Sequence, residues 1–397
     1  MRNFTFKGLF LAVVFIVLGS LSIQAADDGL ITRQVTIKLE KAGTLPNKIG
    51  STKKFQITNL KIIGEINGTD LRMIREMAGK DVWGNDTDGV LSVLDLSDAK
   101  VVEGGYYYYC IDGDYCITSN DKIGDYAFKG CFGLKSLTLP SGVTWIGDYA
   151  FSGCSGLKSL TLPSGLTKIG ERAFFHCSGL TSIPLPSGVT WIGDYAFSGC
   201  SGLTSLTLPS GVTWIGDYTF SGCSGLKSLT LPSGLTRIGD YAFSGCSGLT
   251  SLTLPSGLTK IGYDAFYGCS GLTSMTLPSG VTEIGHSAFY GCSGLTSIYV
   301  YTEKLPDMGR DVFDGCDAKK CTVYVPKGTY DDYWLSEFGY FENIVEFDPT
   351  GINNVITSND AKELSRYSLN GQRLSAPTKG LNIVKYSDGS VKKVVVQ

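Results

Sequence analysis

Residues 157–179 read LKSLTLPSGLTKIGERAFFHCSG, and this unit recurs along the chain with a step of 23 residues. Its cysteine returns eight times, and the phenylalanine three positions earlier and the Ile-Gly pair keep the same step. The eight cysteines are Cys131, Cys154, Cys177, Cys200, Cys223, Cys246, Cys269 and Cys292. A unit this short cannot bury its own apolar face, so successive units must stack. The sequence therefore predicts a solenoid of eight stacked coils.

Each coil divides into three segments of different local character. Leu160-Thr161-Leu162 alternates apolar and polar residues, which predicts a short strand with the threonine turned outward. The turn residues Pro163-Ser164-Gly165 follow, and a second extended piece ends at Ile169. In the commoner copies, such as Gly193–Cys200, an aspartate and a glycine bracket one predicted helical turn. The expected fold is a mainly β solenoid with parallel strands and short helical turns, capped at both ends.

The composition of the chain fits such coils and argues against several function classes. Of the 51 glycines in 397 residues, 30 occupy four fixed positions of the unit, where corners need positive φ or close backbone approach. A formal net charge of -3 supplies no field to hold polyanions, so nucleic acid is not an expected partner. With only two histidines and no nucleophile-base or metal constellation, we expect a non-enzymatic protein without cofactor or metal.

The motif L-x-x-L-x-L-P followed by I-G-x-x-A-F-x-x-C resembles the BspA-like leucine-rich repeats of bacterial surface proteins. The resemblance covers roughly Ile123–Pro326, and it rests on several fixed residues that recur eight times at one spacing. It implies an interaction role: adhesion to host or matrix proteins, or to other cells. The repeat implies a scaffold and names no ligand.

The N-terminal residues 1–25 have the features of a secretory signal peptide. Basic Arg2 and Lys7 precede the apolar run Leu9–Leu18, and small residues lead to a predicted cleavage site after Ala25, with Ala26 as the alternative. No later stretch approaches the ~18 apolar residues of a membrane span. We therefore expect an exported protein, extracellular or on the outer cell surface, with no span left after signal removal.

Both flanks of the repeat are expected to cap its open ends. Residues 26–120 contain Leu60–Met77 and Leu91–Ala99, which look like degenerate coils and predict an N-terminal cap. The solenoid then occupies 121–326, and a helical cap follows over 327–348. The aromatic residues of that helix, placed at helical spacing after Thr329, are Tyr330, Tyr333, Trp334 and Phe338.

Residues 349–397 follow a different pattern. Tyr367–Leu374 predicts a hairpin around the Asn370-Gly371 turn, and Leu381–Val384 with Val391–Val396 predicts a second hairpin. These strands resemble the C-terminal sorting domain of the type IX secretion system, in which a Tyr-x-Leu-x-Gly strand and a terminal Lys-Val strand recur. The resemblance implies a small β segment for sorting or anchoring at the cell surface.

The cysteine ladder suggests either disulfides or a row of buried thiols. Stacked coils repeat at ~4.8 Å, but parallel Cβ vectors lie farther apart than the ~3.8 Å that a disulfide prefers. No C-x-x-C spacing supports zinc. We therefore expect reduced thiols that act as small hydrophobic side chains. Outside the ladder, Cys110 and Cys116 are the favoured disulfide pair, and Cys316 with Cys321 is the alternative.

Two columns of aromatic residues form the first candidate binding surface. The residue before each Ile-Gly pair should point outward, and a tyrosine column should lie beside it. The first column contains Trp145, Trp191 and Trp214, and the second contains Tyr126, Tyr149, Tyr195, Tyr218 and Tyr241. Such residues suit protein partners, and aromatic ladders also suit sugar rings. The units that begin at Trp191 and Trp214 differ at only three positions, so duplication alone is the alternative explanation.

The outward strand residues form a competing surface, on the face that leucine-rich repeats usually use. Its members are Lys135, Lys158, Thr181, Thr204, Lys227, Thr250, Thr273 and Thr296. The candidate partners are host, matrix or cell-surface proteins, with glycans as the alternative for the Trp/Tyr columns.

Three substitutions depart from the unit. His176 stands where glycine is usual and His286 where an acidic residue is usual, so we expect two solvent-facing replacements. Pro184 stands where other strands have an outward threonine. Because proline lacks a ladder N–H, we predict a local defect in the sheet at Ser182–Leu185.

Overall fold

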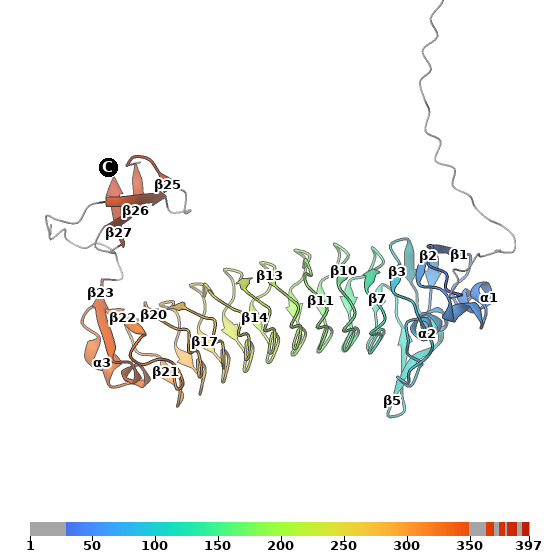
Figure 1. The fold of residues 1–397 in the computed structure, drawn as a ribbon, viewed down its shortest axis with the longest axis horizontal. Coiled ribbons are helices and arrows are strands. Elements are labelled where there is room, and N and C mark those ends of the chain that lie inside the picture. Colours follow the sequence, from blue (N-terminus) through green and yellow to red (C-terminus); the bar gives the residue numbers. More distant parts are fainter. Residues whose placement is uncertain (1–28, 349–362, 369–372, 378, 387–390, 397) are drawn as a thin grey trace, which may run out of the picture.

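The computed structural model describes residues 29–348, 363–368, 373–377, 379–386 and 391–396, so the predicted signal peptide lies outside the described residues. Residues 29–348 form an elongated β-solenoid whose coils follow one another along the long axis (Figure 1). The strands of neighbouring coils are parallel and in register, as where Leu160 lies opposite Leu137. The β-solenoid predicted from the repeat is confirmed.

The first sheet carries the Leu-Thr-Leu segments. Its strands are β3 (Val93–Asp95), β8 (Ser136–Thr138), β10 (Ser159–Thr161), β13 (Ser205–Thr207), β15 (Ser228–Thr230), β18 (Ser274–Leu277), β20 (Ser297–Val300), β22 (Thr322–Pro326) and β23 (Asn343–Phe347). Buried leucines alternate with outward threonines, which is the period of a strand with one face on the core.

The second sheet carries the Ile of each Ile-Gly pair. Its strands are β7 (Lys122–Ile123), β9 (Trp145–Ile146), β11 (Lys168–Ile169), β12 (Trp191–Ile192), β14 (Trp214–Ile215), β16 (Arg237–Ile238), β17 (Lys260–Ile261), β19 (Glu283–Ile284) and β21 (Asp307–Met308). In the first eight of these strands the isoleucine is buried and the residue before it faces outward.

The third side of each coil, the turn side, corrects one prediction. Between residues 121 and 313, all of them described, no helix forms, and the turn side consists of single i→i+3 turns, as where the N–H of Ser198 donates to the carbonyl of Tyr195 at 3.0 Å. Tyr195 adopts a left-handed φ of 57°, which interrupts any right-handed helical run. Asp194 does not cap a helix, because its Oδ1 accepts the N–H of Asp217 from the next coil at 2.9 Å. The N–H of Phe197 likewise donates to the carbonyl of Thr219 at 2.9 Å, so the turn side is a third ladder between coils.

Three of the four glycine positions have the predicted purpose in clear form, among them the Ser-Gly position, where a Cβ on Gly179 would lie 2.3 Å from the Ser155 carbonyl oxygen. Gly199, before the cysteine, has a φ of 73°, and His176 takes the same left-handed conformation with a φ of 55°. At Gly193, after the isoleucine, a Cβ would lie 2.6 Å from the Glu171 nitrogen of the preceding coil. The Pro-Ser-Gly position varies, since Gly165 has neither a positive φ nor a close neighbour, whereas a Cβ on Gly280 would lie 2.9 Å from the Ser256 carbonyl oxygen.

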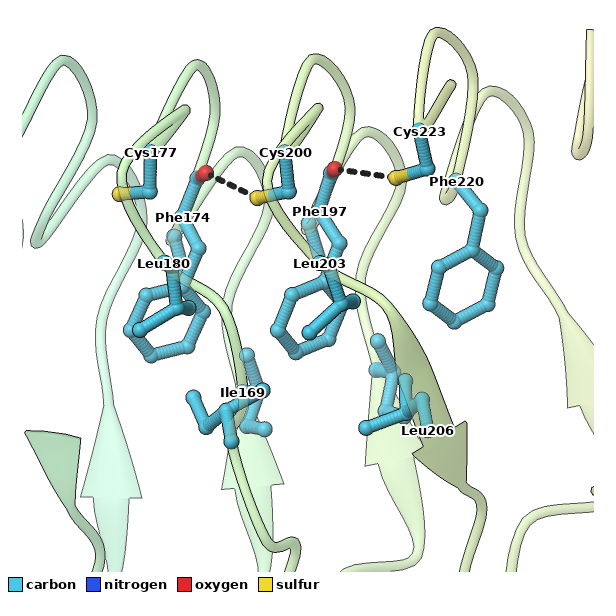
Figure 2. Close-up of a cluster of buried hydrophobic side chains, with 14 of the residues drawn as sticks. Ile169, Phe174, Cys177, Leu180, Phe197, Cys200, Leu203, Leu206, Phe220 and Cys223 are labelled. Atoms are coloured by element: carbon cyan, nitrogen blue, oxygen red, sulfur yellow. Dashed lines mark hydrogen bonds between the residues drawn. The ribbon is translucent and has the colours of Figure 1, made fainter. Parts of the chain in front are cut away.

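The core of the solenoid is built from columns of identical side chains. Nine phenylalanines stack in one column, with ring centroids of neighbours 5.1–5.8 Å apart. They are Phe128, Phe151, Phe174, Phe197, Phe220, Phe243, Phe266, Phe289 and Phe313. Figure 2 shows three of these rings with the cysteine and leucine columns beside them. Because each ring covers its neighbours, burial of the column requires consecutive coils.

Residues before the repeat continue the first sheet. The elements are β1 (Val35–Leu39), α1 (Leu45–Ile49), η1 (Lys53–Phe55), β2 (Asn59–Ile66), α2 (Gly68–Met77), β4 (Ala99–Val101), β5 (Gly104–Ile111) and β6 (Asp114–Thr118). Strand β2 pairs in parallel with β1 and with β3, which joins β8 of the repeat. A capping box of Asn67 and Asp70 begins α2. The β5–β6 hairpin projects from this end of the solenoid (Figure 1).

Two side chains complete the turn-side ladder where no coil precedes the first one. Arg75 of α2 is fully buried, and its Nη1 donates to the carbonyls of Tyr126 at 2.8 Å and Ala127 at 3.0 Å. In the next coil, the carbonyl of Ala150 accepts the N–H of Phe128. The Tyr108 hydroxyl donates to the carbonyl of Asp125 at 2.9 Å. These side-chain donors take the place of backbone N–H groups, which closes the N-terminal end of the ladder.

The C-terminal end is closed by α3 (Tyr330–Trp334), η2 (Glu337–Tyr340) and the edge strand β23. Phe313, the last ring of the core column, contacts Phe338 and Phe341 at centroid distances of 4.9 and 5.1 Å. The helix has only five residues and is shorter than the aromatic spacing suggested. Of the four aromatic residues predicted for it, Tyr333 and Phe338 are buried, the latter in η2, whereas Tyr330 and Trp334 are exposed.

The described parts of the C-terminal segment form one antiparallel sheet. Its strands are β24 (Glu363–Ser368), β25 (Arg373–Leu374), β26 (Gly380–Tyr386) and β27 (Val391–Val396). Both predicted hairpins are confirmed, since β24 pairs with β25 and β26 with β27. Strand β24 also pairs with β26, which joins the two hairpins. The Asn370-Gly371 turn lies outside the described residues.

The defect predicted at Pro184 is confirmed. Ser182–Leu185 forms no strand, and the first sheet ends at β10 and resumes at β13. A second gap lies beside it in the second sheet, between β12 and β14. At other steps the glycine after isoleucine donates to the isoleucine one coil back, as Gly239 does to Ile215 at 2.8 Å, but no bond joins Gly216 to Ile192. Residues 180–202 therefore contact the next coil mainly through turn-side hydrogen bonds and core side chains.

Candidate interaction surfaces

The tyrosine column on the turn side is stacked upon itself. Its members, in order, are Tyr109, Tyr126, Tyr149, Arg172, Tyr195, Tyr218 and Tyr241. Neighbouring rings lie 4.4–5.1 Å apart and nearly parallel. The Arg172 guanidinium fills the gap in the column, 5.4 Å from the Tyr149 ring and 4.1 Å from the Tyr195 ring. Sequence reasoning identified the tyrosines of the repeat and missed Arg172 and Tyr109.

This stacking limits what the column offers to a partner. A sugar or an aromatic ligand stacks on a free ring face, but each interior ring of the column has neighbours on both faces. Burial among Tyr195 and Tyr241 raises the pKa of Tyr218 to about 12. The column therefore stabilises the turn side and presents only ring edges and hydroxyl groups to the surface.

The three tryptophans of the second sheet are half-buried and lie in different surroundings. Trp145 lies opposite Lys122 and Lys168, and the Lys122 Nζ is 4.4 Å from the indole centroid. Trp191 and Trp214 flank the gap between β12 and β14, and no ring contact joins them. The prediction that they form a binding pair stays a prediction.

The outward residues of the first sheet are all exposed, and the threonines and the lysines among them differ in the interactions that they make. The threonines bond to the scaffold, as where the Thr273 hydroxyl donates to the carbonyl of Thr250 at 3.2 Å. Lys135, Lys158 and Lys227 form no ion pair within the described residues. This face therefore offers free ammonium groups on a regular Ser/Thr surface.

Sequence reasoning missed an aromatic cluster at the C-terminal end of the first sheet. This cluster, called the terminal aromatic cluster below, consists of Tyr299, Tyr301, Tyr324 and Phe347. The rings of Tyr299 and Tyr324 stack at 4.6 Å, and Tyr299 stands opposite Thr276, in the column that threonines occupy elsewhere. Tyr299 is 36% exposed and the adjacent Val345 is 46% exposed. The signal was present as the Ser297–Tyr301 departure from the Ser-Leu-Thr-Leu-Pro consensus.

The eight ladder cysteines are free, buried thiols. From Cys154 onward each Sγ donates to the carbonyl of the phenylalanine one coil earlier, as Cys200 does to Phe174 at 3.1 Å (Figure 2). Burial raises the pKa of Cys223 and of Cys269 to about 12. These thiols are therefore protonated at neutral pH and contribute packing and a hydrogen bond.

The disulfide predicted between Cys110 and Cys116 is not present in the structure, where both thiols are free. The hairpin register pairs Cys110 with Tyr115, and Cys116 with Tyr109. Adjacent residues of a strand point to opposite faces, so the two thiols lie on opposite sides of the hairpin. Cys316 and Cys321, the alternative pair, are also free and buried.

Both histidines are exposed, as predicted, but one has a further role. His286 takes the place of the turn-side aspartate, and its Nδ1 accepts the N–H of Arg310 from the next coil at 2.7 Å. A neutral imidazole provides the acceptor that a carboxylate provides in other coils. His176 retains the backbone conformation of the glycine it replaces.

The described residues contain neither a candidate metal cluster nor a helix that could span a membrane. No group of three or more His, Cys, Asp or Glu side chains is placed to hold a metal ion within this part of the chain. None of its helices is both long and apolar enough to cross a bilayer.

Comparison with known proteins identifies the repeat. Residues 121–232 and 213–330 match the family described as BspA type leucine-rich repeat region, in six copies. A leucine-rich cell surface protein from Faecalibacterium prausnitzii A2-165 is 27% identical, with a TM-score of 0.38, and the match covers 62% of this chain and 86% of that chain. A leucine-rich repeat protein from T. pallidum is 29% identical, with a TM-score of 0.28 and coverage of 52% and 72%. No curated protein matches the chain.

Proposed function

Because the chain belongs to the BspA-type leucine-rich repeat family, whose repeat it carries over residues 121–330, we propose that it is a non-enzymatic surface protein that binds other proteins. Adhesion to host, matrix or cell-surface proteins is the form of binding that fits this family. The single observation that carries the proposal is the terminal aromatic cluster on the exposed face of the first sheet.

The chemistry of this face supports a protein partner. Interface hot spots are enriched in tyrosine, because its ring offers a large contact area with few rotatable bonds and a polar hydroxyl. The stacked Tyr299 and Tyr324 hold one another in a fixed orientation, which reduces the entropy lost on binding. The unpaired Lys135, Lys158 and Lys227 lie further along the same face. They add charge that suits an acidic region of the partner.

The glycan alternative receives less support from the columns that first suggested it. Its tyrosine faces are covered by neighbouring rings, and Trp191 and Trp214 are separated by the gap between β12 and β14. A protein partner at the first sheet therefore remains the preferred function, and the glycan alternative is restricted to sites outside the stacked column.

Replacing Tyr299 and Tyr324 together by threonine is expected to weaken binding at least about tenfold, in line with the loss of paired hot-spot residues. Threonine is the residue of the other coils in this column, so the solenoid should remain folded. The measurement is binding of the mature chain to an array of purified collagen, laminin and serum proteins beside a glycan array. Any protein spot bound by the wild type then serves as the probe for surface plasmon resonance.

Tyr290→Ser is the matched control for this experiment. Tyr290 is also 36% exposed, it stacks on Tyr267 at 5.1 Å, and it lies on the turn side, where serine is usual. The affinity of the Tyr290→Ser variant for the protein probe should stay within about twofold of that of the wild type. An equal loss in this variant, or an array on which only glycan spots bind, contradicts the proposal.

We also propose that residues 1–25 direct export and that the segment from 349 acts in sorting to the cell surface. The four-stranded antiparallel sheet β24–β27 supports a small β module, and the sequence of this segment carries the Tyr-x-Leu-x-Gly and Lys-Val features. Deleting residues 364–397 should move the protein from the cell surface to the periplasm, as measured by protease shaving and fractionation. Undiminished surface exposure of the shortened chain, with equal expression, would remove the sorting proposal.

A further inference from the structure

A pocket lies where the projecting β5–β6 hairpin meets the first two coils. It has a volume of about 280 Å³, and its walls include Tyr115 and Ile117 from the hairpin and Ile123 and Trp145 from the second sheet. Small-molecule sites usually have volumes of ~300–1,000 Å³. The pocket is therefore large enough for one ring and too small for an extended chain of rings.

The hairpin side of the pocket exposes large apolar side chains. Tyr115 is 59% exposed and Ile117 is 55% exposed, although both belong to a hairpin that projects into solvent. Exposed large apolar residues that line a concavity indicate a contact surface. Cys116 and Tyr108 also line the pocket, and the Tyr115 ring contacts the Tyr107 ring at a centroid distance of 4.6 Å.

The solenoid side supplies hydrogen-bonding groups with unused capacity. Asp125 uses its Oδ1 to accept the N–H of Asp148 at 2.8 Å, and no bond within the described residues involves its Oδ2. Lys122 forms no ion pair with any described residue, and its Nζ lies over the Trp145 ring. The Trp145 Nε1 is buried and has no acceptor. A buried N–H without an acceptor lowers the stability of the folded state. A small movement of Lys122 would let a ligand oxygen accept this N–H and recover the lost free energy.

We propose that this pocket binds a single neutral pyranose ring, such as the terminal sugar of a glycan. One face of a pyranose is a row of C–H groups that packs on aromatic and aliphatic side chains, here Tyr115, Ile117 and Trp145. Its hydroxyls both donate and accept, which matches one carboxylate, one ammonium and one indole N–H. An anionic ligand is disfavoured by Asp125, and a cationic ligand by Lys122. The site is separate from the first sheet and does not depend on the function proposed for that sheet.

The test uses the full mature chain and four probes of defined structure. These are the methyl pyranosides of glucose, galactose and mannose, and N-acetyltyrosine amide as a peptide-like aromatic. Saturation-transfer-difference NMR should detect at least one methyl pyranoside, with a dissociation constant in the millimolar range from tryptophan fluorescence. Trp145→Glu should weaken that binding at least about tenfold, which corresponds to about 1.4 kcal/mol.

The chain offers a matched control in the same column. Glutamate between Lys122 and Lys168 reproduces the Lys260–Glu283 ion pair seen in later coils, so Trp145→Glu should fold. Trp191→Glu makes the same change outside the pocket and should alter the affinity less than about twofold. Tyr115→Ser, at an exposed hairpin position, should reproduce the loss without a change in the core. Binding of none of the three pyranosides overturns the proposal, as does equal loss in Trp191→Glu or binding of the tyrosine amide alone.

Discussion

Replacing Phe197 with alanine is expected to lower the free energy of unfolding by about 3–5 kcal/mol and to divide the unfolding of the solenoid into two transitions. Phe197 is fully buried between Phe174 and Phe220, at centroid distances of 5.2 and 5.6 Å. Its coil lacks the first-sheet ladder and is not paired with the next coil in the second sheet. The phenylalanine column therefore contributes a larger share of the contacts between this coil and the next than it does between other neighbouring coils. Urea denaturation followed by circular dichroism and by amide hydrogen exchange measures both effects.

Phe243→Ala is the matched control for this prediction. It removes the same side chain at a step where β16 and β17 are paired, so the loss of stability should be similar and the transition should stay single. Adding Pro184→Thr to Phe197→Ala should restore a ladder N–H and bring the two transitions closer together. A loss below about 1 kcal/mol at Phe197, or splitting in both single variants, is incompatible with a weakened step between these coils.

Arg75→Met is expected to destabilise the N-terminal end of the solenoid by about 3–5 kcal/mol. The substitution keeps an apolar stem of similar length but leaves the carbonyl of Ala127 without its donor, while the carbonyl of Tyr126 keeps only the Lys129 N–H. It also removes the guanidinium that lies 4.7 Å from the Tyr109 ring, at the start of the tyrosine column. Hydrogen exchange should show the amides of residues 123–131 losing protection first, because stacked coils fray from an uncapped end.

Arg72→Met on the same helix is the control for Arg75. The Arg72 side chain is 39% exposed and forms an i,i+4 ion pair with Glu76 at 3.7 Å, so its loss should cost less than about 0.5 kcal/mol. Equal destabilisation by the two variants would show that helix α2 itself, rather than the capping bonds, is responsible. Unchanged protection at residues 123–131 in Arg75→Met would exclude the capping role.

The repeat could be predicted because a 23-residue period places each apolar residue above its own copy. The strand at Leu160, the buried phenylalanine and cysteine columns and the defect at Pro184 all follow from that single regularity. The turn side was predicted wrongly, because the pattern Gly-Asp-Tyr-Ala-Phe resembles a capped helix in one unit. Only the stack shows that Asp194 bonds to the next coil and that Tyr195 has a left-handed φ.

Features that occur once could not be read from the period. Arg75 and Tyr108 cap the ladder from a region without internal repeats, so no column marks them. The gap between β12 and β14 lies between two units of nearly identical sequence, so no residue in either unit indicates that the strands are unpaired. Tyr299 was visible as a departure from consensus. Its pairing with Tyr324 depends on the insertion that separates the last two coils.

The buried thiol ladder has a consequence for how the chain reaches its folded state. The proposed export takes the chain through oxidising conditions with twelve free cysteines, and unfolded thiols there form mispaired bridges. Each ladder thiol is covered by contacts with a coil only 23 residues away, so burial needs no distant part of the sequence. Low contact order favours rapid folding. Each new coil can therefore bury its cysteine soon after the preceding coil has folded. This burial is expected to be faster than disulfide formation.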